Sequence, residues 1–136
     1  MIDSRVFLDA SFWIAYRDGR DPRSVQAQAT VRTLLRMRTR FVITMPVFCE
    51  IHAFFSRHPG RRKMVVADLW NNPIVQFEEV THQDQAAAMK VLSLHEDKNF
   101  SLCDVLSFVV MQRLGVTRVV TFDNHFRQFG EFEIVE

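Results

Sequence analysis

Apolar residues follow two patterns along the chain: short β-prone runs, and longer stretches in which they recur every three or four residues. The short runs predict strands at residues 6–8, 41–44, 74–80, 116–122 and 132–135. The recurring pattern predicts helices at residues 11–16, 22–38, 46–58, 64–70, 83–94 and 102–114, and a short helix or turn at 123–129. Strands and helices therefore alternate along the whole chain.

Two proline-containing pairs are expected to mark helix boundaries. Asp21 and Pro22 predict the start of the second helix, because Asp is a preferred N-cap and Pro fits the first helical position. Pro59 and Gly60 are expected to end the third helix before the fourth begins. The apolar face expected on the second helix consists of Val25, Ala29, Leu34 and Leu35.

Alternating strands and helices predict the fold class α/β. Helical crossovers between strands are right-handed and produce a mainly parallel sheet covered on both faces, here a three-layer α/β/α arrangement with four to five strands. A length of 136 residues suits a single domain spanning residues 1–136. In such sheets ligands bind beyond the carboxyl ends of the strands, which is where functional side chains are expected.

Composition and charge narrow the class of protein. An apolar fraction of 48% and a charged fraction of 24% are typical of soluble globular proteins. The N-terminal residues do not form a signal peptide, and charged residues interrupt every apolar stretch before it reaches the roughly 18 residues that span a bilayer. We therefore expect a cytoplasmic protein that does not contact a membrane.

The net charge of +1 excludes strong attraction of nucleic acid by the molecule as a whole. Any RNA contact must be local, and arginine suits phosphate because its planar group donates in pairs. Two groups are candidates, although each also fits an ordinary solvated face: Arg36, Arg38 and Arg40, and Arg61, Arg62 and Lys63.

The cysteines, Cys49 and Cys103, lack the spacing of a zinc site. We expect both to be small buried side chains. A disulfide between them is disfavoured in a reducing cytosol.

Acidic residues follow two of the predicted strands. Asp9 ends the run Val-Phe-Leu-Asp, and Asp123 ends Val-Val-Thr-Phe-Asp, so the same edge of a parallel sheet receives a carboxylate from distant parts of the chain. This placement favours a shared site. The alternative is that each Asp only caps the helix that follows its strand.

Glu50 is expected on an otherwise apolar helix face together with Val47, Ile51 and Phe54. Burial of an unpaired carboxylate is unfavourable, so Glu50 there needs a metal, a proton or an arginine partner.

Asp104 follows Ser101 by three residues, which is the spacing of a capping box at the start of the helix that ends at Gly115. It also suits a fourth ligand. Crowded carboxylates repel one another, and a divalent cation removes that penalty. Oxygen ligands without thiolate or imidazole spacing favour Mg²⁺ or Mn²⁺ over zinc.

The chain resembles the PIN-domain family over nearly its full length, and within it the short VapC-type toxins of toxin–antitoxin pairs. The resemblance rests on Phe-Leu-Asp-Ala-Ser at 7–11, Glu50 after Val-Ile-Thr at 42–44, Ser-Leu-Cys-Asp at 101–104, and Val-Val-Thr-Phe-Asp-Asn-His-Phe at 119–126. Position 10 is Ala where family members often have Thr, a mild departure.

The resemblance implies an endoribonuclease that uses Mg²⁺ or Mn²⁺ and releases a 3′-hydroxyl and a 5′-phosphate. It implies that the metal-binding and catalytic acids are Asp9, Glu50, Asp104 and Asp123, with Ser11 as a polar helper. The correspondence of Thr121 and Asn124 to functional positions of the family is weaker, and His125 is expected to have a structural role.

The resemblance also implies three partners: an RNA substrate, an antitoxin protein, and a second copy of the chain. The apolar side chains of the helical segments between Val47 and Trp70 are the candidate homodimer interface.

Two other functions remain open from the residues. A haloacid-dehalogenase-like phosphatase also begins with a strand ending in Asp, but it requires a second Asp two residues later, where this chain has Ser11. The other is a non-catalytic binding module whose acids receive a basic segment of a partner, which the retention of all four acids disfavours.

Overall fold

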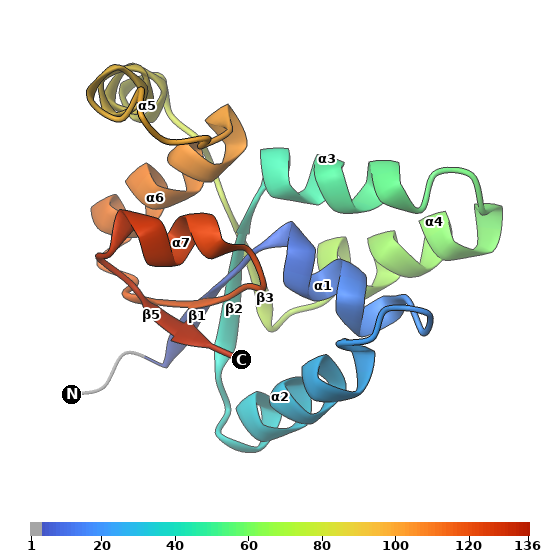
Figure 1. Cartoon of the computed structure of the whole chain (residues 1–136). Coiled ribbons are helices and arrows are strands. Elements are labelled where there is room, and N and C mark those ends of the chain that lie inside the picture. The colour runs from blue at the N-terminus through green and yellow to red at the C-terminus, as the bar shows by residue number, and fades with distance from the viewer. Residues whose placement is uncertain (1–3) are drawn as a thin grey trace.

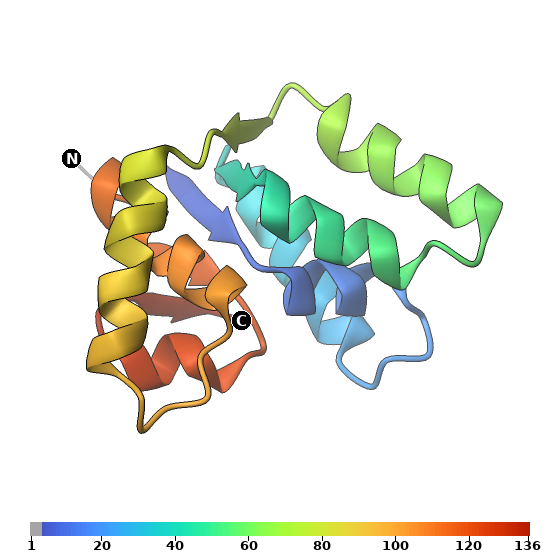
Figure 2. The same cartoon turned by 90° about the horizontal axis from the view of Figure 1, so that it is seen from above.

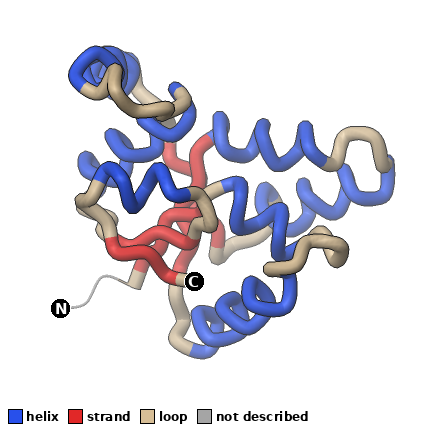
Figure 3. The backbone as a smooth tube through the Cα atoms, viewed as in Figure 1, coloured by secondary structure: helices blue, strands red, loops and turns tan. Residues whose placement is uncertain are grey.

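The computed structural model describes residues 4–136 and contains a five-stranded parallel sheet in the order β3-β2-β1-β4-β5. The strands are β1 (Arg5–Leu8), β2 (Arg40–Thr44), β3 (Val75–Glu78), β4 (Arg118–Val120) and β5 (Glu133–Val135). The helices are α1 (Ala10–Arg17), α2 (Ser24–Arg36), α3 (Met45–Phe54), α4 (Pro59–Val65), the π-helical turn η1 (Val66–Trp70), α5 (His82–Leu94), α6 (Leu102–Leu114) and α7 (Asn124–Phe129). The predicted α/β class and parallel sheet are confirmed (Figure 3).

The helices form two layers around the sheet. Helices α1 to α4 lie on one side, and α5, α6 and α7 gather on the other (Figures 1 and 2). This division follows from right-handed crossovers, because the chain first moves outward from β1 to β3 and then returns to build β4 and β5 on the opposite side of β1. The predicted three-layer arrangement is therefore confirmed.

The second helix differs from the prediction at its start and on its face. It begins at Ser24, because Asp21 forms a turn in which its Oδ1 accepts from the backbone N–H of Arg23 at 2.8 Å. The buried residues are Ser24, Ala27, Val31 and Leu34, whereas Val25 and Leu35 are exposed. Two overlapping helical stripes exist in this sequence, and packing of α2 against α1 selects the one that contains the small Ala27.

The fourth helix begins at Pro59 and not near Met64. Proline lacks an N–H and is compatible with the first turn of a helix. Pro59 and Gly60, which were expected only to end the third helix, therefore also start the fourth. The last turn, η1, is π-helical.

The expectation of two buried cysteines is wrong for Cys49, which is exposed on α3, and only partly right for Cys103, which is half-buried. Both are free thiols, as expected.

A cluster of phenylalanines packs α6 against α7. Phe108 stacks on Phe129 with ring centroids 4.4 Å apart and meets Phe126 edge-on at 5.0 Å. Phe100, which precedes α6, contacts Phe108 edge-on at 5.3 Å. These contacts fix the relative position of the first turns of α6 and α7.

The sheet register brings distant segments to one edge. Phe7 of β1 pairs with Val42 of β2 on one side and Val119 of β4 on the other. The backbone N–H of Asp9 donates to the carbonyl of Val120 at 3.1 Å, which extends this pairing beyond the end of β1. The residues that follow β1, β2 and β4 therefore lie at the same end of the sheet.

None of the helices within residues 4–136 combines the length and the apolar character that crossing a membrane requires.

Candidate active site

All five predicted site residues line one open cleft at the carboxyl end of the sheet. The cavity has a volume of about 400 Å³. Its lining residues come from the starts of α1, α6 and α7 and from α3, and they are Asp9, Ala10, Ser11, Ile14, Glu50, Ser101, Asp104, Asp123 and His125. Residues more than 100 positions apart are thus brought together by the parallel sheet.

Asp9 is the most buried of the acids, with 7% of its surface exposed. Its Oδ2 accepts from the hydroxyl of Ser11 at 2.6 Å and from that of Thr121 at 2.7 Å. Burial raises the pKa of Asp9 to about 6; the two hydroxyls oppose this shift, and the charges of Asp104 and Asp123 add to it. The Asp9 side chain does not cap α1, so the capping alternative is wrong for this residue.

Ser11 and Thr121 position Asp9 and the chain after β4. The Ser11 oxygen donates to Asp9 and accepts from the backbone N–H of Phe122 at 3.0 Å. The Thr121 oxygen accepts from the backbone N–H of Asp123 at 2.9 Å. Both hydroxyls are already engaged by the protein, which gives Ser11 the geometry of a group that holds Asp9 in place.

Asp104 both caps a helix and faces the cleft. The predicted capping box is present: the Asp104 N–H donates to the Ser101 hydroxyl at 3.0 Å, and the Ser101 N–H donates to Asp104 Oδ2 at 3.1 Å. Gly115 ends α6 in the left-handed conformation, as its position predicted. The cap thus holds Asp104 at the cleft, and the two roles suggested by the sequence coexist.

Asp123 likewise caps α7, because its Oδ1 accepts from the backbone N–H of His125 at 3.0 Å. The capping alternative is therefore correct as a description of one oxygen of Asp123. It does not account for the other oxygen.

One oxygen of each aspartate is left free. Protein hydrogen bonds within residues 4–136 reach Oδ2 of Asp9, Oδ2 of Asp104 and Oδ1 of Asp123. The remaining oxygens, Oδ1 of Asp9, Oδ1 of Asp104 and Oδ2 of Asp123, accept no protein hydrogen bond in that part of the chain. Each carboxylate is thus anchored by one oxygen and available through the other.

Glu50 lines the cleft but is exposed, so its predicted burial on an apolar face is wrong. Val47 and Ile51 form the buried face of α3, while Phe54 is 49% exposed where α3 extends beyond the core. Glu50 lies at the edge of that face, where the helix meets the cleft. The pKa of the Cys103 thiol is raised, mainly by burial and secondly by the Glu50 carboxylate. Glu50 therefore lies near Cys103, in the first turn of α6.

His125 is the cleft residue whose place the sequence did not indicate. Its ring, with Asp104 and Asp123, offers ligand atoms that all lie within 4.8 Å of one another. Asp9 and Glu50 line the same cleft but stand outside this group. The available signal was the spacing of His125 two residues after an acid at the end of a strand.

Comparison with known proteins agrees with this geometry. The sequence profile of the PIN domain matches residues 6–131, which include all five predicted site residues. The chain is 29% identical over 131 residues to the 23S rRNA-specific endonuclease VapC20 of Mycobacterium tuberculosis, covering 95% of this chain and 97% of the relative.

Two solved structures have a similar fold. The crystal structure of M. tuberculosis VapC20, described as a sarcin-ricin loop cleaving toxin, superposes with a TM-score of 0.83 and 26% identity, over 96% of this chain and 99% of that chain. A toxin–antitoxin complex from Klebsiella pneumoniae superposes with a TM-score of 0.67 over 96% of each chain, and its 12% identity is evidence of the fold alone. Because the family profile matches residues 6–131 and the cleft and the similar structures agree with it, the chain belongs to the PIN domain family, whose nucleases depend on a metal ion.

Proposed function

We propose that this protein is an endoribonuclease that uses Mg²⁺ or Mn²⁺, and that it is the toxin of a toxin–antitoxin pair. The observation that carries the proposal is the cleft in which Asp9, Asp104 and Asp123 each keep one oxygen free of protein hydrogen bonds. The relative VapC20 is named as an endonuclease specific for 23S rRNA, which supports RNA as the substrate class and the cytoplasm as the location.

The donor set fits a hard divalent cation. Three carboxylates supply oxygen atoms without a thiolate, and Mg²⁺ and Mn²⁺ prefer such ligands. The raised pKa of Asp9 reflects burial and repulsion from the neighbouring acids, and a cation relieves both costs. When bound, the ion supplies Lewis acidity that lowers the pKa of a coordinated water and polarises the phosphate.

The protein residues then have separate tasks. Asp9, Asp104 and Asp123 hold the cation, and Ser11 keeps Asp9 oriented through its 2.6 Å hydrogen bond. Glu50 presents an exposed carboxylate on the α3 side of the cleft, where it completes the ligand set or accepts a proton from the attacking water.

The two alternative functions are less well supported. A phosphatase of the haloacid-dehalogenase type requires an acid two residues after Asp9, and Ser11 at that position is committed to holding Asp9. A non-catalytic binding module does not require free carboxylate oxygens arranged for a cation.

RNA contact near the cleft is best supported for Arg23. Its guanidinium lies over the ring of Phe122 at 4.6 Å, and Phe122 in turn stacks on Phe12 at 5.4 Å. Phe122 directly precedes Asp123, so this stack places the Arg23 guanidinium, which is also paired with Asp21 at 3.2 Å, at the edge of the acidic cleft. Of the two predicted basic groups, the one at Arg36 to Arg40 leads into the start of β2, at the opposite end of the sheet from the acids.

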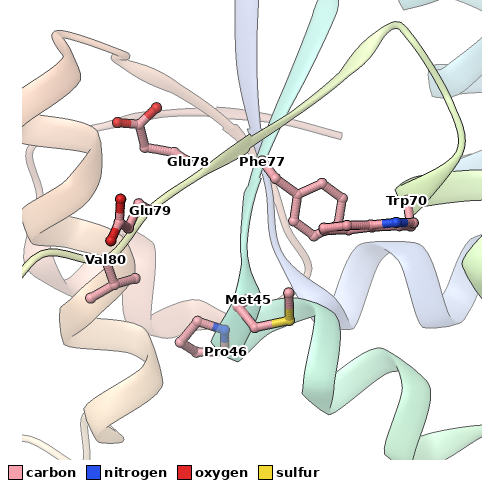
Figure 4. A pocket seen from close by; sticks show the side chains of 7 residues that line it. All are labelled: Met45, Pro46, Trp70, Phe77, Glu78, Glu79 and Val80. Atoms are coloured by element: carbon pink, nitrogen blue, oxygen red, sulfur yellow. The ribbon is translucent and has the colours of Figure 1, made fainter.

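The homodimer implied by the resemblance has a candidate surface on the α3, α4 and η1 side. Met45, Phe54 and Trp70 are 46%, 49% and 56% exposed. Figure 4 shows a hollow lined by Met45 and Trp70, in which Trp70 and Phe77 meet edge-on with centroids 4.9 Å apart above Met45 and Pro46. Val47 and Ile51, which belonged to the predicted interface segment, are buried within the monomer, so the exposed residues would form the contact.

RNA cleavage tests the proposed reaction. Purified protein is expected to cut single-stranded RNA in Mg²⁺ or Mn²⁺ and to lose activity in EDTA.

Asp104→Asn is expected to abolish cleavage while the fold persists, because Asn still caps α6 but is a poorer ligand. The matched control is Asp84→Asn: Asp84 forms the same capping box with Thr81 on α5, outside the cleft, so the folded variant should retain activity. Full activity in EDTA, or in Asp104→Asn, contradicts the proposal.

The unfavourable burial of the ionised Asp9 carboxylate is tested by the dependence of stability on pH. The pKa of Asp9 is about 6 in the folded protein and 3.8 in the unfolded chain. The protonated carboxyl therefore stabilises the fold fully below pH 3.8, and this contribution is lost as the pH rises through about 6. The ionised group at pH 8 then costs about 3 kcal/mol relative to the protonated one.

We expect Asp9→Asn to raise the Tm at pH 8 in metal-free buffer, and the gain to shrink toward pH 5. Mn²⁺ should raise the Tm of the wild type more than that of the variant. Asp97→Asn, which changes an exposed carboxylate, serves as the control. If Asp9→Asn has a lower Tm than the wild type at pH 8 without metal, the prediction is wrong.

Arg23 is tested by steady-state kinetics on RNA. Arg23→Gln is expected to raise KM several-fold with a smaller change in kcat, because a phosphate contact at the edge of the cleft contributes to binding more than to chemistry. Arg36→Gln, a charge change at the distant end of the sheet, should leave KM unchanged. Equal KM for the wild type and Arg23→Gln removes Arg23 from the RNA path.

Light scattering tests the dimer. The wild type is expected to be dimeric at micromolar concentration, and Trp70→Ser should shift it toward monomer. Leu94→Ser removes an apolar side chain on α5 that is 77% exposed and should leave the dimer intact. A monomeric wild type refutes the proposed assembly.

A further inference from the structure

His125 lies between two of the aspartates that the proposed function assigns to the metal. Its Nδ1 is 2.6 Å from Oδ2 of Asp104 and 3.3 Å from Oδ1 of Asp123. A carboxylate only accepts hydrogen bonds, so the short contact requires a hydrogen on Nδ1. The Nδ1–H therefore binds Asp104, while the backbone N–H of His125 donates to Oδ1 of Asp123 at 3.0 Å, so one residue links the acid on α6 to the acid that caps α7.

The imidazole is held from outside the cleft. Phe100 meets its ring edge-on, with centroids 5.6 Å apart and planes at 78°. The next residue, Phe126, is fully buried against Phe108. The aromatic cluster that joins α6 to α7 therefore sets the position of His125 from the side away from the acids.

The contact with Asp104 complements the helix cap. Oδ2 of Asp104 accepts from the Ser101 N–H, within its own helix, and from His125 on α7. The cap orients Asp104 relative to α6 alone, whereas His125 ties it to the helix that carries Asp123. Both hydrogen bonds use the same oxygen, which leaves Oδ1 of Asp104 available.

We propose that His125 is a positioning residue: its Nδ1–H binds Asp104 and its backbone N–H binds Asp123, and together they hold the two acids at a fixed spacing so that their free oxygens bind the divalent cation together. This inference rests on the proposed metal-dependent function. His125 is not itself a ligand through Nδ1, because that nitrogen carries the hydrogen that binds Asp104. Loss of such an outer hydrogen bond typically weakens metal binding by about 10- to 100-fold.

The test is Mn²⁺ affinity of full-length variants, measured by calorimetry. His125→Asn places an amide N–H near the position of Nδ1 and is expected to retain most of the affinity. His125→Gln moves the amide away from that position, and His125→Phe keeps a ring without a donor; both are expected to bind Mn²⁺ about 10- to 100-fold more weakly. The pair Asn and Gln carries the test even if the Phe variant does not fold.

His95→Gln is the matched control. The His95 ring also contacts Phe100, at 5.8 Å, but its Nδ1 is hydrogen-bonded to the carbonyl of Val91 and not to an acid. Its Mn²⁺ affinity should equal that of the wild type. A loss as large as that of His125→Gln would trace the effect to the aromatic cluster and overturn the proposal.

Pulsed electron paramagnetic resonance of the Mn²⁺-loaded wild type separates positioning from ligation. No directly bound nitrogen is expected, and the signal of a coordinated imidazole overturns the proposal. Equal Mn²⁺ affinity in the wild type and in His125→Gln overturns it too, while leaving the metal site standing. A wild type that binds no Mn²⁺ instead refutes the proposed function.

Discussion

Burial of the Asp9 carboxylate beside other acids, at one end of a parallel sheet, is the constraint on which the rest of the site depends. Burial and the neighbouring charges of Asp104 and Asp123 both raise the pKa of Asp9. Such an arrangement is unfavourable in the empty protein and becomes favourable only when a cation neutralises it. The fold must therefore hold the acids in place against their own charge.

Hydrogen bonds from side-chain hydroxyls and from helix caps provide that restraint. Thr121 and Ser11 bind Asp9, the Ser101 cap binds Asp104, and a backbone N–H binds Asp123. Each contact uses one carboxylate oxygen and leaves the second. Behind α6 and α7, the phenylalanine cluster around Phe108 makes this half of the cleft rigid. Helix caps that are usually considered structural thus contribute to the geometry of the acidic cleft.

Much of the fold and of the site was predictable because the signals are local. Short β-prone runs identified the strands and a period of three to four residues identified the helices, and their alternation indicated a parallel sheet. Since parallel strands end at one edge, acids that follow β1 and β4 had to converge, which is why Asp9 and Asp123 were found from the sequence. The spacing of Asp104 from Ser101 predicted its capping box, whereas its place among the site acids was implied by the resemblance to the PIN-domain family.

By itself, then, the sequence determined the fold class, the edge at which the site forms and the acids that line it, since these depend on residues near one another in the chain. Only the tertiary structure decided that α2 buries Ala27 in place of Val25, that Glu50 is exposed, and that His125 stands between Asp104 and Asp123. The reason is that a helix with two possible faces, or a ring whose acidic partner lies on another helix, acquires its environment from the element that packs against it. That partner is chosen by long-range packing, which no local pattern encodes.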